Sequence, residues 1–310
     1  MTRQVFASAL MAILFASVSS TAAAENAPVK KLLVIGIDGC RYDALRRADT
    51  PNIDRLLEQA AVAEPIRIYP ARYREADTIS GPGWSSILTG VWADKHGVLD
   101  NEFKSPNYEE YPHFFALLKQ ARPEAVTASF SDWAPIAEEI VSHADVVRSF
   151  PSEKESYVQG DADVTEAAAQ LLENGEPTAV FVYLGQVDET GHAHGFHPSV
   201  PQYMDAIERV DRHIGELMEA IANRNDRAAE DWLVLVTTDH GGRGTGHGGG
   251  HEDPDVAVSF IIASGPSVKP GPIDGESSLV DLVPTGLTHL GIEIDPAWKL
   301  DGLPLVPRAR

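Results

Sequence analysis

The sequence is poor in cysteine and in basic residues, and both shortages exclude classes of protein. Cys40 is the only cysteine among 310 residues, so no intramolecular disulfide can form and the core must supply the stability. Lys and Arg together number 25 against 46 acidic residues, which gives a formal net charge of −21. This charge would repel nucleic acid polymers and anionic membranes, so we expect neither as a partner. A small phosphate ester is still compatible, because bound divalent cations would reverse the sign of the charge locally.

Long apolar runs are also absent beyond the N-terminus. After the basic opening Thr2-Arg3-Gln4, the stretch from Val5 to Val18 is almost wholly apolar, and Ala22-Ala23-Ala24 supplies small residues behind it. This pattern is typical of a secretory signal peptide, and the run is short for a membrane span. We therefore expect residues 1–24 to be a signal peptide and residues 25–310 to form one mature domain, periplasmic or secreted. A retained N-terminal anchor is the alternative.

Apolar runs alternate with amphipathic segments along the rest of the chain. Continuous apolar runs predict buried strands, and apolar residues that recur with a period of 3.6 predict helices. The predicted strands are Lys31–Ile37, Ala125–Phe130, Thr178–Leu184, Trp232–Thr237 and Val256–Ile262. One predicted helix begins at Thr50-Pro51. The others span Trp84–Val91, Glu110–Gln120, Asp161–Leu172, Pro201–Ala222 and Leu279–Leu290. This alternation predicts an α/β fold, with a mostly parallel central sheet flanked by helices on both faces.

Six carboxylates and imidazoles follow the predicted strands closely, from separated stretches of the chain. They are Asp38, Asp188, His192, Asp239, His240 and His247. Because ligands in such sheets lie beyond the carboxyl ends of the strands, we expect these side chains to converge on one edge. Oxygen and nitrogen ligands of this kind suit a pair of borderline divalent ions, with zinc as the expected metal and manganese or iron as alternatives. Each short motif could also be a polar strand end or a surface loop, and His251 competes with His247 for the last position.

A hydroxyl group lies between the first and second of these stretches. Ser80 opens the segment Ser80-Gly81-Pro82-Gly83-Trp84 ahead of a predicted helix, where backbone N–H groups favour phosphate oxygens. Two metal ions and a hydroxyl nucleophile are suited to displacement at phosphorus or sulfur. We therefore expect Ser80 to act as the nucleophile in contact with the metal ions, and Thr78 is the alternative.

Several of these motifs, taken in order, resemble the alkaline phosphatase superfamily. They are Ile37-Asp38-Gly39, the stretch from Ser80 through Leu88-Thr89-Gly90 to His96-Gly97, Asp188-x-x-x-His192 and Thr238-Asp239-His240-Gly241. The segments Leu279–Thr285 and Asp301-Gly302 are similar to the C-terminal helix and tail of that superfamily. Within it, the chain most resembles the nucleotide pyrophosphatase/phosphodiesterase branch, from about Leu32 to its end.

The resemblance implies an assignment of the site residues. One ion would be held by Asp188, His192 and His247, and the other by Asp38, Asp239 and His240. The family position of the nucleophile selects Ser80, although phosphodiesterase members usually carry threonine there. The resemblance also implies that Asn101 donates a hydrogen bond to a non-bridging oxygen of the substrate, whereas on residue type alone Asn101 would be ordinary turn chemistry.

The resemblance also separates the candidate reactions. Ser80-Gly81-Pro82 begins like the sulfatase pattern, but Trp84 stands where that pattern has arginine. The Lys-x-Arg pair of a bacterial monoesterase branch has no counterpart in Ser129–Trp133. We therefore expect a phosphodiesterase or nucleotide pyrophosphatase that forms a phosphoryl-serine. The alternatives are a phosphomonoesterase of the same superfamily, then a sulfatase or phosphonate hydrolase, then an inactive metal-binding scaffold. The sequence carries no signal for the physiological substrate or the oligomeric state.

Overall fold

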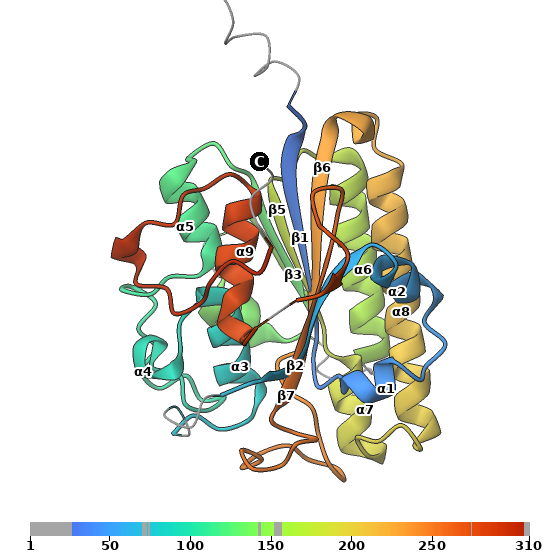
Figure 1. The fold of residues 1–310 in the computed structure, drawn as a ribbon. Coiled ribbons are helices and arrows are strands. Elements are labelled where there is room, and N and C mark those ends of the chain that lie inside the picture. Colours follow the sequence, from blue (N-terminus) through green and yellow to red (C-terminus); the bar gives the residue numbers. More distant parts are fainter. Residues whose placement is uncertain are drawn as a thin grey trace, which may run out of the picture.

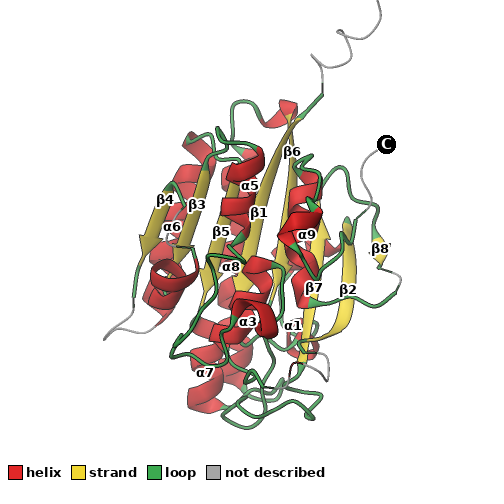
Figure 2. Ribbon diagram, turned by 90° about the vertical axis from the view of Figure 1, so that its left-hand side faces the viewer, coloured by secondary structure: helices red, strands yellow, loops and turns green. Residues whose placement is uncertain are grey.

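An eight-stranded sheet runs through the centre of the molecule, with helices packed against both faces (Figures 1 and 2). The structure is a computed structural model that describes residues 27–69, 73, 75–141, 144–151, 157–273 and 275–306. The expected signal peptide at residues 1–24 lies outside these residues. The strands are β1 (Val29–Ile37), β2 (Ala60–Arg67), β3 (Thr127–Ser131), β4 (Val146–Ser149), β5 (Ala179–Leu184), β6 (Glu230–Thr237), β7 (Val258–Ser264) and β8 (Gly271–Pro272).

The sheet is mostly parallel, in the order β4-β3-β5-β1-β6-β7-β2-β8, which confirms the expected fold class. β1 lies at its centre and pairs in parallel with both β5 and β6. β7 runs antiparallel to β6 and to β2. The chain returns from the end of β6 to β7 through a long loop without a crossover helix, and a parallel strand would need such a crossover. Side chains of β1 alternate between two cores, with Leu32 and Val34 in one and Leu33 and Ile35 in the other.

Two groups of helices cover the two faces of the sheet (Figure 1). One face carries α3 (Ser80–Thr89), α4 (Ala93–His96), α5 (Phe114–Ala121) and α9 (Leu282–His289), with the π-helix η2 (Ile136–Ile140) and the 3-10 turn η4 (Leu279–Asp281). The other carries α1 (Tyr42–Leu45), α2 (Pro51–Leu57), α6 (Tyr157–Asn174), α7 (Gln186–His194) and α8 (Pro201–Ala222). Two further 3-10 turns are η3 (Arg227–Ala229) and η5 (Pro296–Trp298). None of the helices in the described ranges combines the length and hydrophobicity that crossing a bilayer would need.

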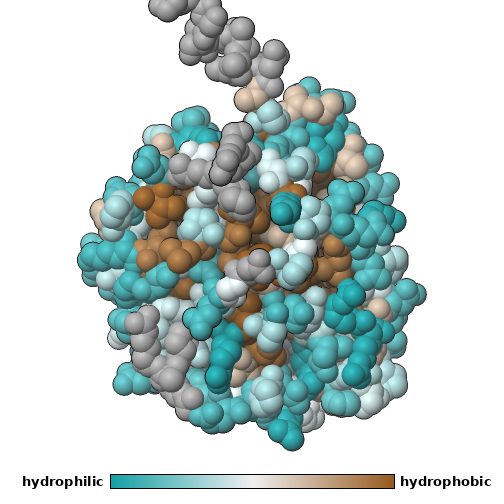
Figure 3. All heavy atoms as spheres, in the orientation of Figure 1, coloured by the Kyte–Doolittle hydropathy of each residue, from teal (hydrophilic) through white to brown (hydrophobic). Residues whose placement is uncertain are grey.

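Much of the face seen in Figure 3 is hydrophilic, in keeping with the acidic composition. In the same view, apolar residues gather over the side of the molecule where α5 and α9 lie. Trp298, Leu300 and Leu305 of the C-terminal segment are partly buried there, packed against the core of that face. The C-terminal segment therefore closes the core on this side of the sheet.

Most predicted elements are present, and the differences have local causes. α8 has the predicted bounds, and the helix predicted at Trp84 begins four residues earlier, at Ser80. β2 was not predicted, because Glu64-Pro65 interrupts its apolar pattern, and its pairing with β7 is irregular between Ala63 and Ile66. β4 was also not predicted, since it is a short edge strand that is half-buried or exposed.

Candidate metal centre

The carboxyl ends of the parallel strands meet at the lower edge of the sheet in Figures 1 and 2, close to α3 and α7. Asp38 follows β1, Asp239 and His240 follow β6, and α7 follows β5 directly. The structure brings all six predicted ligands together there as two groups. In each group, the candidate ligand atoms lie within 4.8 Å of one another. The groups are Asp188 with His192 and His247, and Asp38 with Asp239 and His240.

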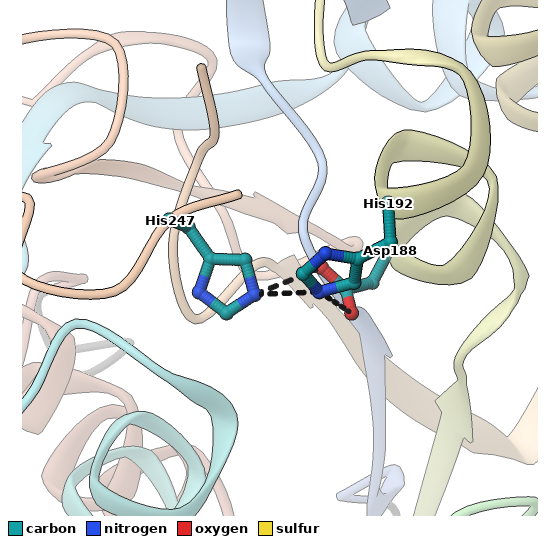
Figure 4. A group of neighbouring side chains, drawn as sticks. All are labelled: Asp188, His192 and His247. Atoms are coloured by element: carbon teal, nitrogen blue, oxygen red, sulfur yellow. Dashed lines mark hydrogen bonds and ion pairs between the residues drawn. The ribbon is translucent and has the colours of Figure 1, made fainter. Parts of the chain in front are cut away.

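The first group combines one turn of α7 with a loop (Figure 4). Asp188 and His192 lie four residues apart on α7, so both side chains project from the same helix face, and His247 reaches them from the glycine-rich loop after β6. The Nε2 atoms of His192 and His247 are 3.0 Å apart. They lie 3.3 and 3.5 Å, respectively, from the carboxylate of Asp188. Three ligand atoms therefore face one point.

All three histidines are oriented in the same way by the backbone. The Nδ1 atom of each lies within hydrogen-bond distance of a carbonyl oxygen, and these carbonyls belong to Thr245 (3.0 Å from His192), Gly241 (2.8 Å from His240) and Thr78 (2.8 Å from His247). A neutral imidazole that donates its Nδ1–H keeps the Nε2 lone pair for a metal ion. Metal-ligating histidines show this pattern, in which a backbone acceptor fixes both the tautomer and the ring.

The second group is almost fully buried, and its chemistry favours a cation. His240 Nε2 lies 3.2 Å from Asp239 Oδ2 and 3.5 Å from Asp38 Oδ1. Within the described residues, His240 Nε2 and Asp239 Oδ2 make no hydrogen bond, and neither does Asp188 Oδ1 of the first group. A buried polar atom without a partner costs about 1–3 kcal/mol, and more if it is charged. The two groups therefore fit divalent metal ions, which would give these atoms their missing partners.

One oxygen of Asp38 is held by two neutral donors. The Trp84 indole Nε1–H donates to Asp38 Oδ2 at 2.9 Å, and the Tyr183 hydroxyl donates to the same oxygen at 2.5 Å. The other oxygen, Oδ1, faces His240 and the hydroxyl of Ser80. Trp84 and Tyr183 therefore fix the carboxylate so that one oxygen is left for a ligand. Neither residue is among the predicted site residues, although a tyrosine in an otherwise apolar buried strand is a signal that its hydroxyl has a polar partner.

Burial and neighbouring charges shift the pKa values of several of the candidate ligands. Burial, together with the charges of Asp38 and Asp188, raises the pKa of Asp239 well above its ordinary value. Burial and the neighbouring His240 lower the pKa of His247 to about 4. The hydrogen bond with Asp188 raises the pKa of His192 to about 9. A metal ion would have to displace the protons that Asp239 and His192 keep, and the carboxylates of the two groups would attract it.

Ser80 is the first residue of α3 and is 6% exposed. Its Oγ lies 3.4 Å from Asp38 Oδ1, next to the second group. Asn101 accepts a hydrogen bond from the Gly81 backbone N–H at 2.6 Å, which ties it to the first turn of α3. His251, the alternative to His247 as a ligand, packs on the Tyr69 ring and lies in neither group. The Thr78 hydroxyl is fully buried, where it donates to the His247 carbonyl and accepts from the Gly250 backbone N–H.

A pocket of about 410 Å³ opens above Ser80. Its walls are aromatic and polar, formed by Ile79, Ser80, Asn101, Trp133, Tyr157, Tyr183, Gly185, Asp188, Glu189, His192, Gly246, His247 and Gly248. Trp133 and Tyr183 are stacked with their ring centroids 6.1 Å apart. Among these lining residues, none is Lys or Arg, and Glu189 adds a negative charge at the mouth. Apart from its histidines, the lining therefore offers a phosphate group no cationic side chain.

Comparison with known proteins identifies the family. The family model of type I phosphodiesterase / nucleotide pyrophosphatase matches residues 32–248. The chain belongs to this family. This confirms the resemblance drawn from the motifs. Among curated relatives of the phosphodiesterase family, ectonucleotide pyrophosphatase/phosphodiesterase family member 7 of Homo sapiens is 26% identical over 230 residues, which is 68% of this chain and 47% of the relative. The chain thus spans about half the length of the curated relatives it matches.

Solved structures show the same fold at low sequence identity. An inactive form of murine ectonucleotide pyrophosphatase/phosphodiesterase 5, in complex with AMP, superposes with a TM-score of 0.62 at 14% identity. The match covers 85% of this chain and 96% of that one. A 2-O GAG sulfatase superposes with a TM-score of 0.70 at 13% identity, over 90% of this chain and 73% of that one. These likenesses confirm that this chain has an alkaline phosphatase-like fold.

Proposed function

We propose that this chain is a metal-dependent phosphodiesterase or nucleotide pyrophosphatase that cleaves small phosphate esters through a phosphoryl-serine at Ser80. The observation that carries the proposal is the position of Ser80: its Oγ lies at the start of α3, 3.4 Å from a carboxylate of one ligand group, in a pocket lined by the other. A nucleophile beside two candidate cation sites is an arrangement that suits phosphoryl transfer. Membership in the phosphodiesterase family supports the same reaction class.

The residues of the chain supply binding, orientation and a nucleophile. Metal ions held by the two groups would lower the pKa of the Ser80 hydroxyl and neutralise the phosphate, and the ligand types favour two zinc ions. At the first turn of α3, where backbone N–H groups were expected to meet phosphate oxygens, Gly81 donates to Asn101, Gly83 donates to Ile79 and Pro82 has no N–H, so few free donors remain for these oxygens. Asn101, tied to Gly81, is placed to orient one of them. In-line attack by Ser80 Oγ on phosphorus forms the phosphoryl-serine and releases the alcohol, and water then hydrolyses this intermediate.

The charge of the pocket favours a diester over a monoester. A phosphodiester carries one negative charge, whereas the terminal phosphate of a monoester carries nearly two at neutral pH and gains more from a cationic clamp. The lining residues offer no Lys or Arg, and Glu189 opposes additional negative charge. A phosphomonoesterase is therefore the second candidate. A sulfatase is less well supported, because Trp84 fills the position of the sulfatase arginine and donates to Asp38.

We also propose that the protein is exported to the periplasm or secreted. The support is the basic opening, the apolar run and the small residues of positions 1–24.

Inactive scaffolds usually lose a ligand or the nucleophile. Here the complete set of predicted ligands and Ser80 lie together, which supports an active enzyme.

A substrate panel on zinc-loaded protein tests this function. We expect hydrolysis of bis-nitrophenyl phosphate with a kcat/KM at least about a hundredfold above that for nitrophenyl phosphate, and about two zinc ions per chain by elemental analysis. Ser80→Ala should lower turnover of the diester by at least about a thousandfold. Ser85→Ala is the matched control, because Ser85 lies on the same helix and its hydroxyl bonds to Gly81 and Tyr108.

Three results would contradict the proposal. A monoester preference of about a hundredfold would assign the phosphomonoesterase activity instead. Undiminished turnover in Ser80→Ala would remove the nucleophile from the mechanism. Zinc binding without hydrolysis of any phosphate, phosphonate or sulfate ester would indicate a metal-binding scaffold.

A further inference from the structure

Behind the metal centre, one buried side chain collects an unusual number of contacts. Arg41 is 5% exposed, and all five of its guanidinium N–H groups have acceptors. Nε and Nη2 donate to Asp43 at 2.9 and 3.0 Å, and Nη2 also donates to Asp255 at 2.9 Å. Nη1 donates to two backbone carbonyls, those of Phe196 at 3.2 Å and Gly242 at 3.1 Å.

These acceptors belong to the segments that carry the metal ligands. Arg41 itself lies just after Asp38, in the loop that follows β1. Gly242 follows Asp239 and His240, and Phe196 follows the end of α7. One guanidinium therefore joins the loops after β1 and β6 to the C-terminal end of α7, and these three segments provide the aspartates and histidines of both ligand groups.

The contact with Phe196 extends to two of the imidazoles. The Phe196 ring lies edge-on to His192 and to His247, with centroid distances of 5.3 and 5.8 Å. It is enclosed by two glycines, Gly191 and Gly242, since a Cβ atom on either would overlap the ring. A shift of the Phe196 backbone would therefore carry the ring against the two imidazoles that face Asp188.

We propose that Arg41 is a positioning residue for both ligand groups, and that it holds these three segments at the separation that metal binding requires. It touches neither the ligand atoms nor the pocket. A lysine cannot take over this role, because an ammonium group is a single point charge, whereas the planar guanidinium holds two carboxylates and two carbonyls at once. This inference rests on the metal-dependent function proposed above.

The chain contains a matched control at the opposite edge of the sheet. Arg224 is also 5% exposed, and it uses its guanidinium in the same way. Its Nε and Nη2 atoms donate to Glu230 at the start of β6, and its Nη1 atom donates to the carbonyls of Leu172 and Gly175. Arg224→Lys therefore removes a similar set of buried contacts far from the ligands, which separates a general loss of stability from a loss of metal affinity.

The experiment compares Arg41→Lys, Arg224→Lys and wild type in zinc affinity and in thermal unfolding. Zinc dissociation constants come from competition with a chromophoric chelator, and melting temperatures are measured with EDTA and with zinc chloride. We expect both variants to melt at lower temperature in EDTA. Only Arg41→Lys should weaken zinc binding, by about 10–100-fold, and only this variant should show a smaller rise in melting temperature on zinc addition.

Asp255→Asn keeps the test decisive if Arg41→Lys does not fold. Its carboxylate is partly exposed and holds one Nη2 contact, so the variant should fold and weaken zinc binding by at least about threefold. Zinc affinity within about twofold of wild type in Arg41→Lys, or an equal loss in Arg224→Lys, would overturn the inference and leave the proposed function intact. Wild-type protein that binds no zinc would overturn both.

Discussion

A buried pair of carboxyl groups next to the pocket gives a quantitative prediction about stability and pH. Asp161 of α6 is fully buried, and its Oδ1 accepts from the backbone N–H groups of Gly185 (2.9 Å) and Gln186 (3.4 Å), where the chain enters α7. Burial raises the pKa of Asp161 to about 7. Burial and the charge of Asp161 raise the pKa of its neighbour Asp132 well above the ordinary value.

The sign of the effect follows from proton linkage. In the unfolded chain Asp161 releases its proton near pH 4, whereas in the folded protein it keeps the proton until about pH 7. Between these values the folded state binds more protons, so its stability falls as the pH rises. The raised pKa of Asp161 corresponds to a loss of about 4 kcal/mol in the free energy of unfolding, complete above pH 7.

Asp161→Asn should remove this pH dependence, because an amide does not titrate and its oxygen can still accept from Gly185. Relative to wild type, the free energy of unfolding of the variant should rise by about 4 kcal/mol between pH 4 and pH 8. For a chain of this size the melting temperature of the variant should rise relative to wild type by roughly 10 °C over the same range. Circular dichroism melts in EDTA measure this. The titration of Asp239 is common to both proteins and cancels, whereas the variant removes the charge that raises the pKa of Asp132, which changes the difference in the same direction.

Glu230→Gln is the control for this experiment. The ion pair with Arg224 outweighs burial and lowers the pKa of Glu230 to about 2, so this carboxyl is ionised in both states above pH 5.5. The control should be destabilised by a constant amount between pH 5.5 and pH 8. A difference between Asp161→Asn and wild type that stays constant within about 1 kcal/mol over this range would refute the reasoning.

Three other predictions concern the metal centre. Tyr183→Phe removes one of the two donors to Asp38 Oδ2, so zinc affinity should fall by about 10–100-fold in chelator competition. An unchanged zinc affinity would show that the Tyr183 hydroxyl does not orient Asp38. Thr78→Val should weaken zinc binding because the hydroxyl that holds the His247 carbonyl is lost, while Thr78→Ser should retain it; equal loss in both would contradict this. Asp239→Asn should lose one zinc ion in elemental analysis and nearly all diester turnover, and wild-type rates would count against the assignment.

The fold and the convergence of the ligands were predictable because they depend on simple regularities. Apolar runs identified the parallel strands around β1, and parallel strands must present their carboxyl ends at one edge, so Asp38, Asp188 and Asp239 had to meet. Residues that support the ligands were less accessible to this reasoning. Tyr183 acts through a hydrogen bond between neighbouring strands, and Arg41 through contacts with loops that are distant in the sequence. Such contacts depend on the final packing, which no local pattern encodes.

The choice between alternatives in the site also depended on packing. Thr78 and Ser80 are hydroxyl residues two positions apart, and residue type does not separate them. In the structure Thr78 turns toward the His247 loop and is fully buried, while Ser80 begins α3 beside Asp38. The direction of each side chain is set by where α3 begins, and the sequence pattern placed that start four residues too late.

The close approach of Trp84 to β1 links two positions of the chain. Gly36 leaves the space that the indole occupies, because a Cβ atom there would overlap the ring. An alanine at position 36 would therefore push the Nε1 donor away from Asp38. An arginine at position 84 would place a charge in the apolar layer where the indole meets Phe181. The residues at positions 36 and 84 are thus coupled, since a change at either one disturbs the core beneath the metal ligands.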